Sequence, residues 1–342
     1  MKMSLFINPE HHPDDSMSAR LQDHVEQVRL AREIGFDGVA IGSHLNYGSE
    51  VWFPALETLM RLAPEAKGMT LSTCMLVLPL YHPLHVAAQL ALVDAACGGQ
   101  AILGVSPGWQ EDEFRIMGLE HKARISRFVE SVELIKRLFI EDSVTFDGRH
   151  FSVEDLTLAL KPVRKPRPPF WFGGSVEKAV ARAARLADTS LGDTWVASSH
   201  LTRDVIVEQA SVFRNTLAGL GKDTPDDFPL LRNVVVAPNR ETAIRDAGPF
   251  LAASYRVFGE WGLFTDVVGS GKPQLEFDEL LAGRVVIGSP EQCAEQFADL
   301  AQATGCTRFI TRIQWLGMDQ KLVLRTLELL GERVLPMLQL ST

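Results

Sequence analysis

The sequence predicts a parallel (β/α)8 TIM barrel formed by one large α/β domain with inserted loops. Short β-branched or apolar runs alternate eight times with longer segments of helical period, which is typical of repeated strand–helix units around a parallel sheet. The chain of 342 residues is 46% hydrophobic, and no Pro-, Gly- or Ser-rich linker divides it. Barrels with inserted loops commonly reach this length as one unit, so we expect a single domain over residues 1–342.

The expected elements carry recognisable ends. Gly35 ends the helix that begins at Met17, and Pro83 occupies the first turn of another helix. Ser289 caps a third helix and Asp319 caps the last. The eight strands are expected near residues 3–8, 37–42, 70–78, 100–105, 169–173, 189–196, 230–237 and 307–314.

Two segments do not fit the repeat. Residues 141–168 contain a hairpin signal with an Asp147-Gly148 turn, followed by a Pro-rich stretch. Residues 259–285 are rich in glycine and aromatic residues. Because long insertions in a barrel often shape or cover the site, the second segment is a candidate lid.

Composition restricts the class of partner. The formal net charge is −9, and the Lys and Arg residues are scattered, which excludes nucleic acid and an anionic membrane as partners and favours a small molecule. The N-terminus lacks the features of a signal peptide, and no stretch is apolar enough to span a bilayer. The four cysteines form no CxxC pair, so we expect buried thiols of a cytoplasmic protein.

In a barrel of this kind the active site lies at the C-terminal ends of the strands, where the βα loops gather. His44 follows the second strand and can act as acid, base or hydrogen-bond donor near neutral pH; the alternative is a solvated or structural loop histidine. Glu10, His11 and His12 follow the first strand without HxxxH or HExxH spacing, so we expect no metal site.

Two segments bear on anion binding. The turn at residues 173–175, Gly-Gly-Ser, joins the fifth strand to a helix whose unpaired amides and dipole favour a phosphate group; the alternative is a tight turn with a serine cap. Arg124, Arg127 and Glu130 follow one another at three-residue spacing, which favours a salt-bridged helix surface over substrate capture.

Aromatic residues near the expected mouth favour a mainly apolar substrate. Trp109 and Trp195 can wall a flat ring, and they can equally fill the core. Trp109 and Trp261, together with His11, are the side chains that we expect to contact the substrate.

Taken together, these motifs resemble the bacterial-luciferase-like flavin-dependent monooxygenases over almost the whole chain. Residues 35–44 resemble the family's second-strand motif, which reads Gly-Phe-Asp, apolar residues and then Glu-His. Residues 77–84 match its Leu-Pro-x-x-His-Pro segment, and residues 94–109 match its Asp…Ser-Gly-Gly-Arg…Leu-Gly-x-x-x-Gly-Trp stretch. Ser43, Cys97 and Gln100 depart from the usual Glu, Ser and Arg of these motifs, and Pro107 stands where some relatives place a phosphate-binding Arg.

The resemblance implies a flavin enzyme. Reduced FMN, supplied by a separate flavin reductase, would be used with dioxygen to oxygenate a small organic substrate in the barrel mouth. His44 would be the functional histidine, hydrogen-bonding the activated oxygen or moving a substrate proton, and the Cys74–Met75 bond would be a non-prolyl cis peptide against which the flavin packs. The implied cofactor-binding residues are Cys74, Met75, Ser106, Gly173, Gly174, Ser175 and Trp195.

Two other functions remain open on these residues. Relatives with the same motifs use a deazaflavin for hydride transfer without oxygen, as dehydrogenases or reductases. A non-catalytic flavin-binding protein is also compatible with Ser43 and Gln100. Family members often pair, so we expect a homodimer.

Overall fold

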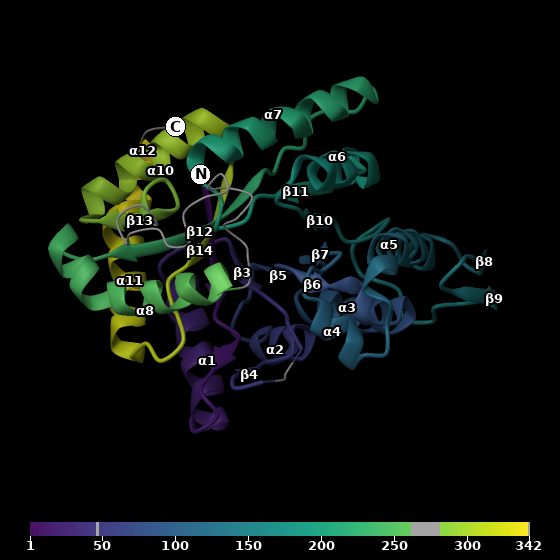
Figure 1. Cartoon of the computed structure of the whole chain (residues 1–342), viewed down its shortest axis with the longest axis horizontal. Helices are drawn as coiled ribbons and strands as arrows, with labels where there is room; N and C mark the ends of the chain where they lie inside the picture. Colours follow the sequence, from purple (N-terminus) through teal and green to yellow (C-terminus); the bar gives the residue numbers. More distant parts are fainter. Residues whose placement is uncertain (46–47, 261–280, 341–342) are drawn as a thin grey trace.

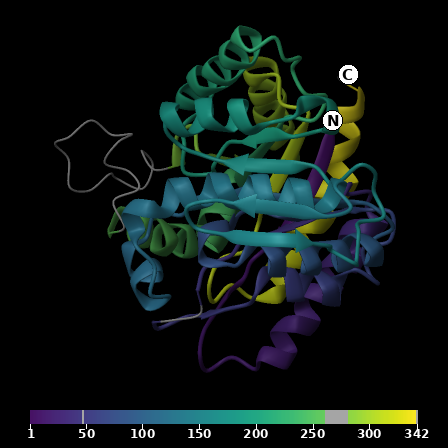
Figure 2. The same cartoon turned by 90° about the vertical axis from the view of Figure 1, so that its right-hand side faces the viewer.

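The structure is a computed structural model that describes residues 1–45, 48–260 and 281–340. It is an α/β fold in which one curled parallel sheet is surrounded by helices (Figure 1, Figure 2). Neighbouring strands follow the order β11-β10-β7-β5-β3-β1-β14-β12-β13, and β6 pairs with β7. The strands are β1 (Lys2–Ile7), β3 (Gly38–Ile41), β5 (Thr70–Thr73), β6 (Leu76–Val77), β7 (Ala101–Ser106), β10 (Phe170–Gly173), β11 (Thr194–Val196), β12 (Pro229–Val236), β13 (Val285–Gly288) and β14 (Arg308–Arg312).

All eight expected strands are present, with two differences from the sequence prediction. The expected strand at 70–78 is divided into β5 and β6, and β13 was not expected; it pairs with the last four residues of β12. Within the described residues the sheet is a curled, incompletely closed barrel. β11 and β12 meet only at a parallel bridge between Ala197 and Leu230, where the Leu231 amide donates to the Ala197 carbonyl at 3.0 Å.

The core has an inner and an outer layer because both faces of the sheet are covered. The strand residues that face inward form one buried apolar cluster, and a larger cluster fills the space between sheet and helices. Burial on both faces explains why the strands read as nearly continuous apolar runs. The inner cluster consists of Phe6, Ala40, Cys74, Ile102, Trp171, Val196 and Ile310.

The helices begin and end where local sequence signals predicted. Gly35 follows α1 with φ +89°, Ser289 forms a capping box with Gln292, and the Asp319 carboxylate accepts from the Lys321 amide. No described helix is long and apolar enough to cross a membrane. The helices are α1 (Met17–Glu33), α2 (Ala55–Leu62), α3 (Pro83–Ala96), α4 (Glu111–Ile116), α5 (Arg124–Ile140), α6 (Glu177–Leu186), α7 (Arg203–Gly219), α8 (Arg240–Glu260), α10 (Pro290–Thr304), α11 (Gln320–Leu329) and α12 (Leu335–Leu340).

The first insertion is the predicted hairpin, formed by β8 (Val144–Asp147) and β9 (Ser152–Leu156). Its turn packs on α5, where the Glu130 carboxylate accepts the backbone amides of Arg149 and His150. Arg127 donates to the Pro79 carbonyl at 2.8 Å and lies over the Phe151 ring. The predicted salt-bridged helix surface is therefore wrong, because Glu130 and Arg127 use their polar groups to hold the hairpin and a neighbouring loop.

Most of the segment 259–285, which we expected to form a lid, lies in residues 261–280, outside the described residues. Trp261 lies outside them as well.

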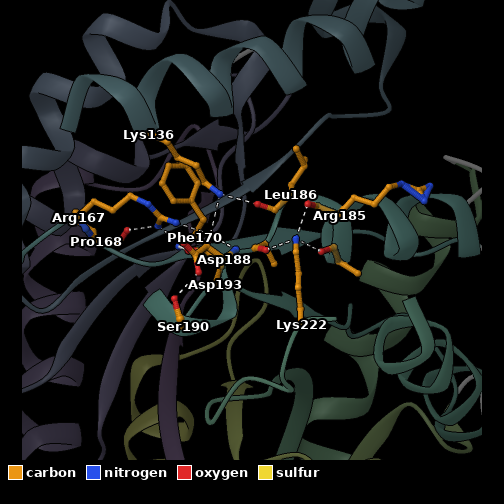
Figure 3. A network of polar contacts seen from close by, with 12 residues as sticks. Lys136, Arg167, Pro168, Phe170, Arg185, Leu186, Asp188, Ser190, Asp193 and Lys222 are labelled. Carbon is orange, nitrogen blue, oxygen red and sulfur yellow. Dashed lines mark hydrogen bonds and ion pairs between the residues drawn. The ribbon is translucent and has the colours of Figure 1, made fainter. Parts of the chain in front are cut away.

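A buried ionic network ties α5 to the N-terminal ends of β10 and β11 (Figure 3). The Asp193 carboxylate accepts from both terminal nitrogens of Arg167 at 2.7 and 2.8 Å and from Lys136 Nζ at 2.9 Å. It also accepts from the backbone amides of Phe170 and Asp188. Burial alone would raise the pKa of Asp193, but these donors and the two cationic charges hold it below its ordinary value.

Candidate active site

Residues from four strands meet at the C-terminal end of the sheet. A Cβ atom added at Gly173 would lie 2.9 Å from Met75 Cγ and 3.3 Å from Ser106 Cβ. A Cβ atom at Gly42, two residues before His44, would lie 3.6 Å from the Cys74 carbonyl oxygen. The segment that carries His44, the Cys74–Met75 link and the end of β10 are therefore neighbours, as expected for one rim of a barrel.

The Cys74–Met75 peptide bond is cis, as predicted. It lies between β5 and β6, and the Cys74 side chain belongs to the inner apolar cluster. Burial raises the pKa of the Cys74 thiol to about 12. The thiol therefore stays protonated near neutral pH, whereas the thiolate is the nucleophilic form. Cys74 serves here as an apolar packing residue.

Glycines allow close packing around Met75. A Cβ atom at Gly104 would lie 1.8 Å from the Thr73 carbonyl oxygen and 3.1 Å from Met75 Sδ, so no other residue fits at that position. A Cβ atom at Gly173 would likewise crowd Met75. Met75 itself is partly exposed, so its side chain offers an apolar surface at the rim.

His44 is paired with a buried carboxylate that sequence reasoning missed. Its Nδ1 atom lies 3.0 Å from Glu113 Oε1, and the Leu45 amide donates to the same oxygen at 2.8 Å. The His44 ring also makes an edge contact with Trp52, at a centroid distance of 4.8 Å. Glu113 is fully buried, and among the described residues its Oε2 atom has no hydrogen-bond partner. With Nδ1 donating to the carboxylate, Nε2 becomes the ring nitrogen that can accept a proton.

The carboxylate beside His44 comes from Glu113 and not from position 43, where this chain has a serine. Ser43 is buried, and its hydroxyl lies 3.4 Å from the Tyr81 hydroxyl. The absence of an acidic residue beside His44 was a signal to look elsewhere for a carboxylate. Helix α4 begins with Glu111, Asp112 and Glu113, and only the tertiary contact selects among the three.

A ring of polar side chains inside the mouth was also missed. Arg312 Nη2 donates to Asn8 Oδ1 at 3.2 Å and to Glu10 Oε1 at 3.1 Å. Asn233 donates to the Tyr255 hydroxyl at 2.9 Å. Strand alternation places Arg312 and Asn233 on the inner face. Arg312 follows the inner-cluster residue Ile310 by two positions, and Asn233 follows Leu231, which packs against that cluster. An apolar lining alone is therefore not a full description of the mouth.

Two side chains hold the backbone of the predicted phosphate-binding corner at residues 173–175. Trp195 Nε1 donates to the Gly174 carbonyl at 2.9 Å, and Gln209 donates to the Ser175 carbonyl at 2.6 Å. Helix α6 begins at Glu177, and its N-cap residue Val176 makes no side-chain capping bond. Ser175 is therefore not the helix cap, and the hydroxyl is not committed to that role.

Trp195 differs from the expectation for a residue that contacts the cofactor. It is fully buried on the helix-facing side of β11, packed against Phe213 and Phe228. Successive strand residues face opposite sides of a sheet, so the indole is directed away from the inner cluster that contains Val196. Its contribution is to hold the Gly174 corner in place.

Two arginines lie close to one another at the start of α5 and on α6. Arg124 Nη1 donates to the His121 carbonyl, whereas its buried Nε atom has no hydrogen-bond partner within the part of the chain that the structure describes. Burial, Arg185 and Arg124 lower the pKa of Arg182. Neither Arg124 nor Arg182 forms an ion pair in the described part of the chain, so this cluster favours an external anion.

The predicted substrate residues have different environments. Trp109 lies after β7 with 38% of its surface exposed. His11 is buried, with its ring centroid 4.4 Å from that of Phe53 and 5.1 Å from that of His24. Burial lowers the pKa of His11 to about 4, so its imidazole is neutral near pH 7. Among the described residues, no group of three or more His, Cys, Asp or Glu side chains could hold a metal ion.

Comparison with known proteins gives a consistent family match. Residues 1–308 match the family model for luciferase-like monooxygenase. The chain is 26% identical to an FMNH2-dependent dimethylsulfone monooxygenase of Pseudomonas putida, over 72% of each protein. It is 25% identical to the oxygenase component of a flavin-dependent trigonelline monooxygenase of Acinetobacter baylyi, covering 76% of this chain and 72% of the relative.

Solved structures show the same fold. The monooxygenase RslO1 of Streptomyces bottropensis superposes with a TM-score of 0.86 at 21% identity, over 98% of this chain and 99% of that chain. The oxygenating constituent of 3,6-diketocamphane monooxygenase from Pseudomonas putida, solved with FMN, gives a TM-score of 0.80 at 18% identity over 98% of both chains. An F420-dependent secondary alcohol dehydrogenase gives 0.77, also at 18% identity and over 98% of both chains.

Proposed function

The chain belongs to the luciferase-like monooxygenase family, and from this premise we propose that it is a flavin-dependent monooxygenase acting on a small, mainly apolar organic substrate. The observation that carries the proposal is the pairing of His44 with buried Glu113 beside the glycine-bordered Cys74–Met75 cis peptide. The relatives named above support FMN as the cofactor and a two-component system in which a separate reductase supplies it.

The residues present fit reduced FMN. The partly exposed Met75 side chain suits the face of a flat ring. The backbone amides of the Gly174–Ser175 corner at the start of α6 suit a phosphate group, and Arg124 acts electrostatically on Arg182 of that helix. When bound, reduced FMN supplies the electrons with which dioxygen is activated.

The chain's own groups position the reaction and handle protons. Glu113 holds His44 Nδ1, so that Nε2 accepts or returns a proton at the mouth. Phe6 and the other apolar residues of the inner cluster fill the inside of the sheet and so exclude water from that side of the site. Asn233 Oδ1 is buried and has no hydrogen-bond partner among the described residues, so it offers an acceptor to a polar group of an otherwise apolar substrate.

The test is substitution of His44. Purified protein is supplied with reduced FMN, dioxygen and a panel of sulfones, N-heterocycles and cyclic ketones, and oxygenated products are detected by mass spectrometry. With the best substrate, His44→Ala should lower turnover by about 10²- to 10⁴-fold, the usual contribution of a positioned acid or base, with little change in flavin affinity. His85→Ala, at an exposed position on α3, is the matched control. Unchanged turnover in His44→Ala would remove His44 from the mechanism.

A deazaflavin-dependent dehydrogenase or reductase is the second candidate, favoured by the structural similarity to the F420-dependent alcohol dehydrogenase. Difference spectra that compare reduced FMN with the deazaflavin distinguish the two, because tighter binding of the deazaflavin together with oxygen-independent hydride transfer would replace the first proposal. Flavin binding without oxidation of any compound would favour the non-catalytic alternative. The homodimer and the cytoplasmic location stay predictions.

A further inference from the structure

A cavity of about 350 Å³ lies between α7 and α10, beside β12 and β13. Helices α7 and α10 pack against each other on the outer face of the sheet (Figure 1). Arg232 leaves β12 on the face opposite Asn233, so the cavity is separate from the mouth that contains His44. Its polar lining consists of Arg203, Arg232, Arg284, Glu295, Gln296 and Asp299.

Arg232 lines this cavity with an incompletely bonded guanidinium. Its side chain is fully buried, and Nη1 donates to the Leu201 carbonyl at 3.0 Å. The other two nitrogens, Nε and Nη2, have no hydrogen-bond partner in residues 1–45, 48–260 and 281–340. These two nitrogens form one edge of the planar group, and that edge matches two oxygens of a carboxylate or phosphate.

The charge of Arg232 is also uncompensated within the described residues. The groups that act on it electrostatically are Tyr255, Cys306 and Arg284, and none is a carboxylate. Of the two acidic residues in the lining, Asp299 is engaged by Arg203 at 2.6 and 3.0 Å, and Glu295 is exposed to solvent. A buried cation with free donors costs stability unless an anion pairs with it.

The neighbours of Arg232 add positive charge. Arg284 is buried and donates to the His200 carbonyl at 2.8 Å. Burial, Arg284 and Arg232 lower the pKa of His200 to about 4, so that imidazole is neutral near pH 7 and provides no counter-charge. Two buried arginines thus share one cavity with space for a small molecule.

We propose that this cavity binds a small oxyanion, two of whose oxygens accept from Nε and Nη2 of Arg232. The ligand class is a small molecule that carries a carboxylate or a phosphate group. This site is independent of the flavin site and of the proposed reaction.

The experiment titrates flavin-free protein with sodium phosphate and with sodium acetate in chloride buffer of constant ionic strength, followed by calorimetry. Arg232→Met should weaken the binding of the preferred anion at least tenfold. Arg232→Lys keeps the charge without the planar edge, so it should also weaken binding. Tighter binding of phosphate or of acetate shows whether the natural ligand carries a phosphate or a carboxylate group.

Phosphate can also bind at the cofactor corner, so Arg124→Met is the matched control. Binding that is lost in Arg124→Met and retained in Arg232→Met belongs to that corner and overturns the proposal, as does the absence of saturable binding. If Arg232→Met does not fold, the arginine Nε–H resonance of Arg232, assigned with Arg232→Lys, is followed in the wild type. A resonance that does not move on titration also overturns the proposal.

Discussion

Two buried carboxylates at opposite ends of the strands differ in how fully their oxygens are hydrogen-bonded. Asp193, at the N-terminal ends of β10 and β11, accepts from two cationic side chains and two backbone amides. Glu113, at the C-terminal side, contacts His44 and the Leu45 amide through Oε1, whereas its Oε2 atom has no hydrogen-bond partner among the residues that the structure describes. Both side chains are fully buried.

This difference separates a structural carboxylate from a functional one. A fully bonded buried network stabilises one arrangement of the chain, whereas a buried group that lacks a partner needs a ligand, a proton or a solvent molecule. In barrels of this type, the N-terminal face contributes mainly to stability and the C-terminal face carries the chemistry. Asp193 and Glu113 follow that division.

The largest expected effect is on stability, in Asp193→Asn. The substitution leaves Arg167 and Lys136 buried beside a neutral amide, which should lower the free energy of unfolding by about 3–5 kcal/mol. Denaturant unfolding followed by circular dichroism measures it. Activity per folded molecule should be unchanged. A loss below about 1 kcal/mol would place Asp193 among ordinary surface pairs and remove the contrast.

Glu113→Gln should give the reverse pattern. Without the negative charge, His44 loses its orienting partner, so turnover should fall by about 10- to 100-fold, the usual cost of losing such a partner, while the free energy of unfolding changes little. The pH profile of turnover should also shift, which a purely structural role would not cause. Glu111→Gln, at an exposed position on the same helix, is the control. Equal pH profiles in the wild type and Glu113→Gln would contradict this role.

The response to acid distinguishes Asp193 from a third buried group, His24. Burial, then His11 and Arg20, lower the pKa of His24 to about 3. The unfolded chain therefore binds a proton near pH 6.5 that the folded chain does not, and stability falls as the pH drops below 6.5. Asp193 has a lowered pKa, so its contribution is lost only at lower pH, near and below the ordinary Asp value.

Between pH 6.5 and 5, His24 should account for a loss of about 1–2 kcal/mol. His24→Gln should reduce the slope of this part of the pH–stability curve by about a third, because His11 and His200 also have lowered pKa values and contribute in the same range. Denaturant unfolding at each pH measures the slope. Asp193→Asn should leave the slope in this range unchanged. An equal slope in the wild type and His24→Gln would show that His24 is not the group that titrates.

The smallest expected effect concerns an arginine that contrasts with Arg167. Arg167 has its carboxylate partner in the chain, whereas Arg124 has none in the described residues and keeps a buried Nε without a bond. Arg124→Met should raise the Kd for reduced FMN about tenfold, equal to about 1.4 kcal/mol, with stability unchanged or slightly raised. Anaerobic fluorescence titration measures it. An unchanged Kd for reduced FMN in Arg124→Met would show that the phosphate group of FMN does not bind near α5.

Local sequence signals determined the elements and much of the rim. Alternating apolar and helical segments predicted the eight strands, and short motifs predicted the caps at Ser289 and Asp319. These features depend on backbone preferences and on side chains a few residues apart. Strand β13 was not predicted, because it begins at Val285, where the segment interpreted as an insertion ends, and has only four residues.

Only the tertiary structure decided which side chains complete the site. Periodicity does not reveal which face of β11 carries Trp195, or which of three acidic residues on α4 contacts His44. Nor does it reveal that Arg124 has no acidic partner among the described residues. Each of these facts depends on contacts between segments that are distant in sequence. The physical reason is that hydrogen-bond satisfaction is a property of the packed interior, where water no longer completes a missing bond.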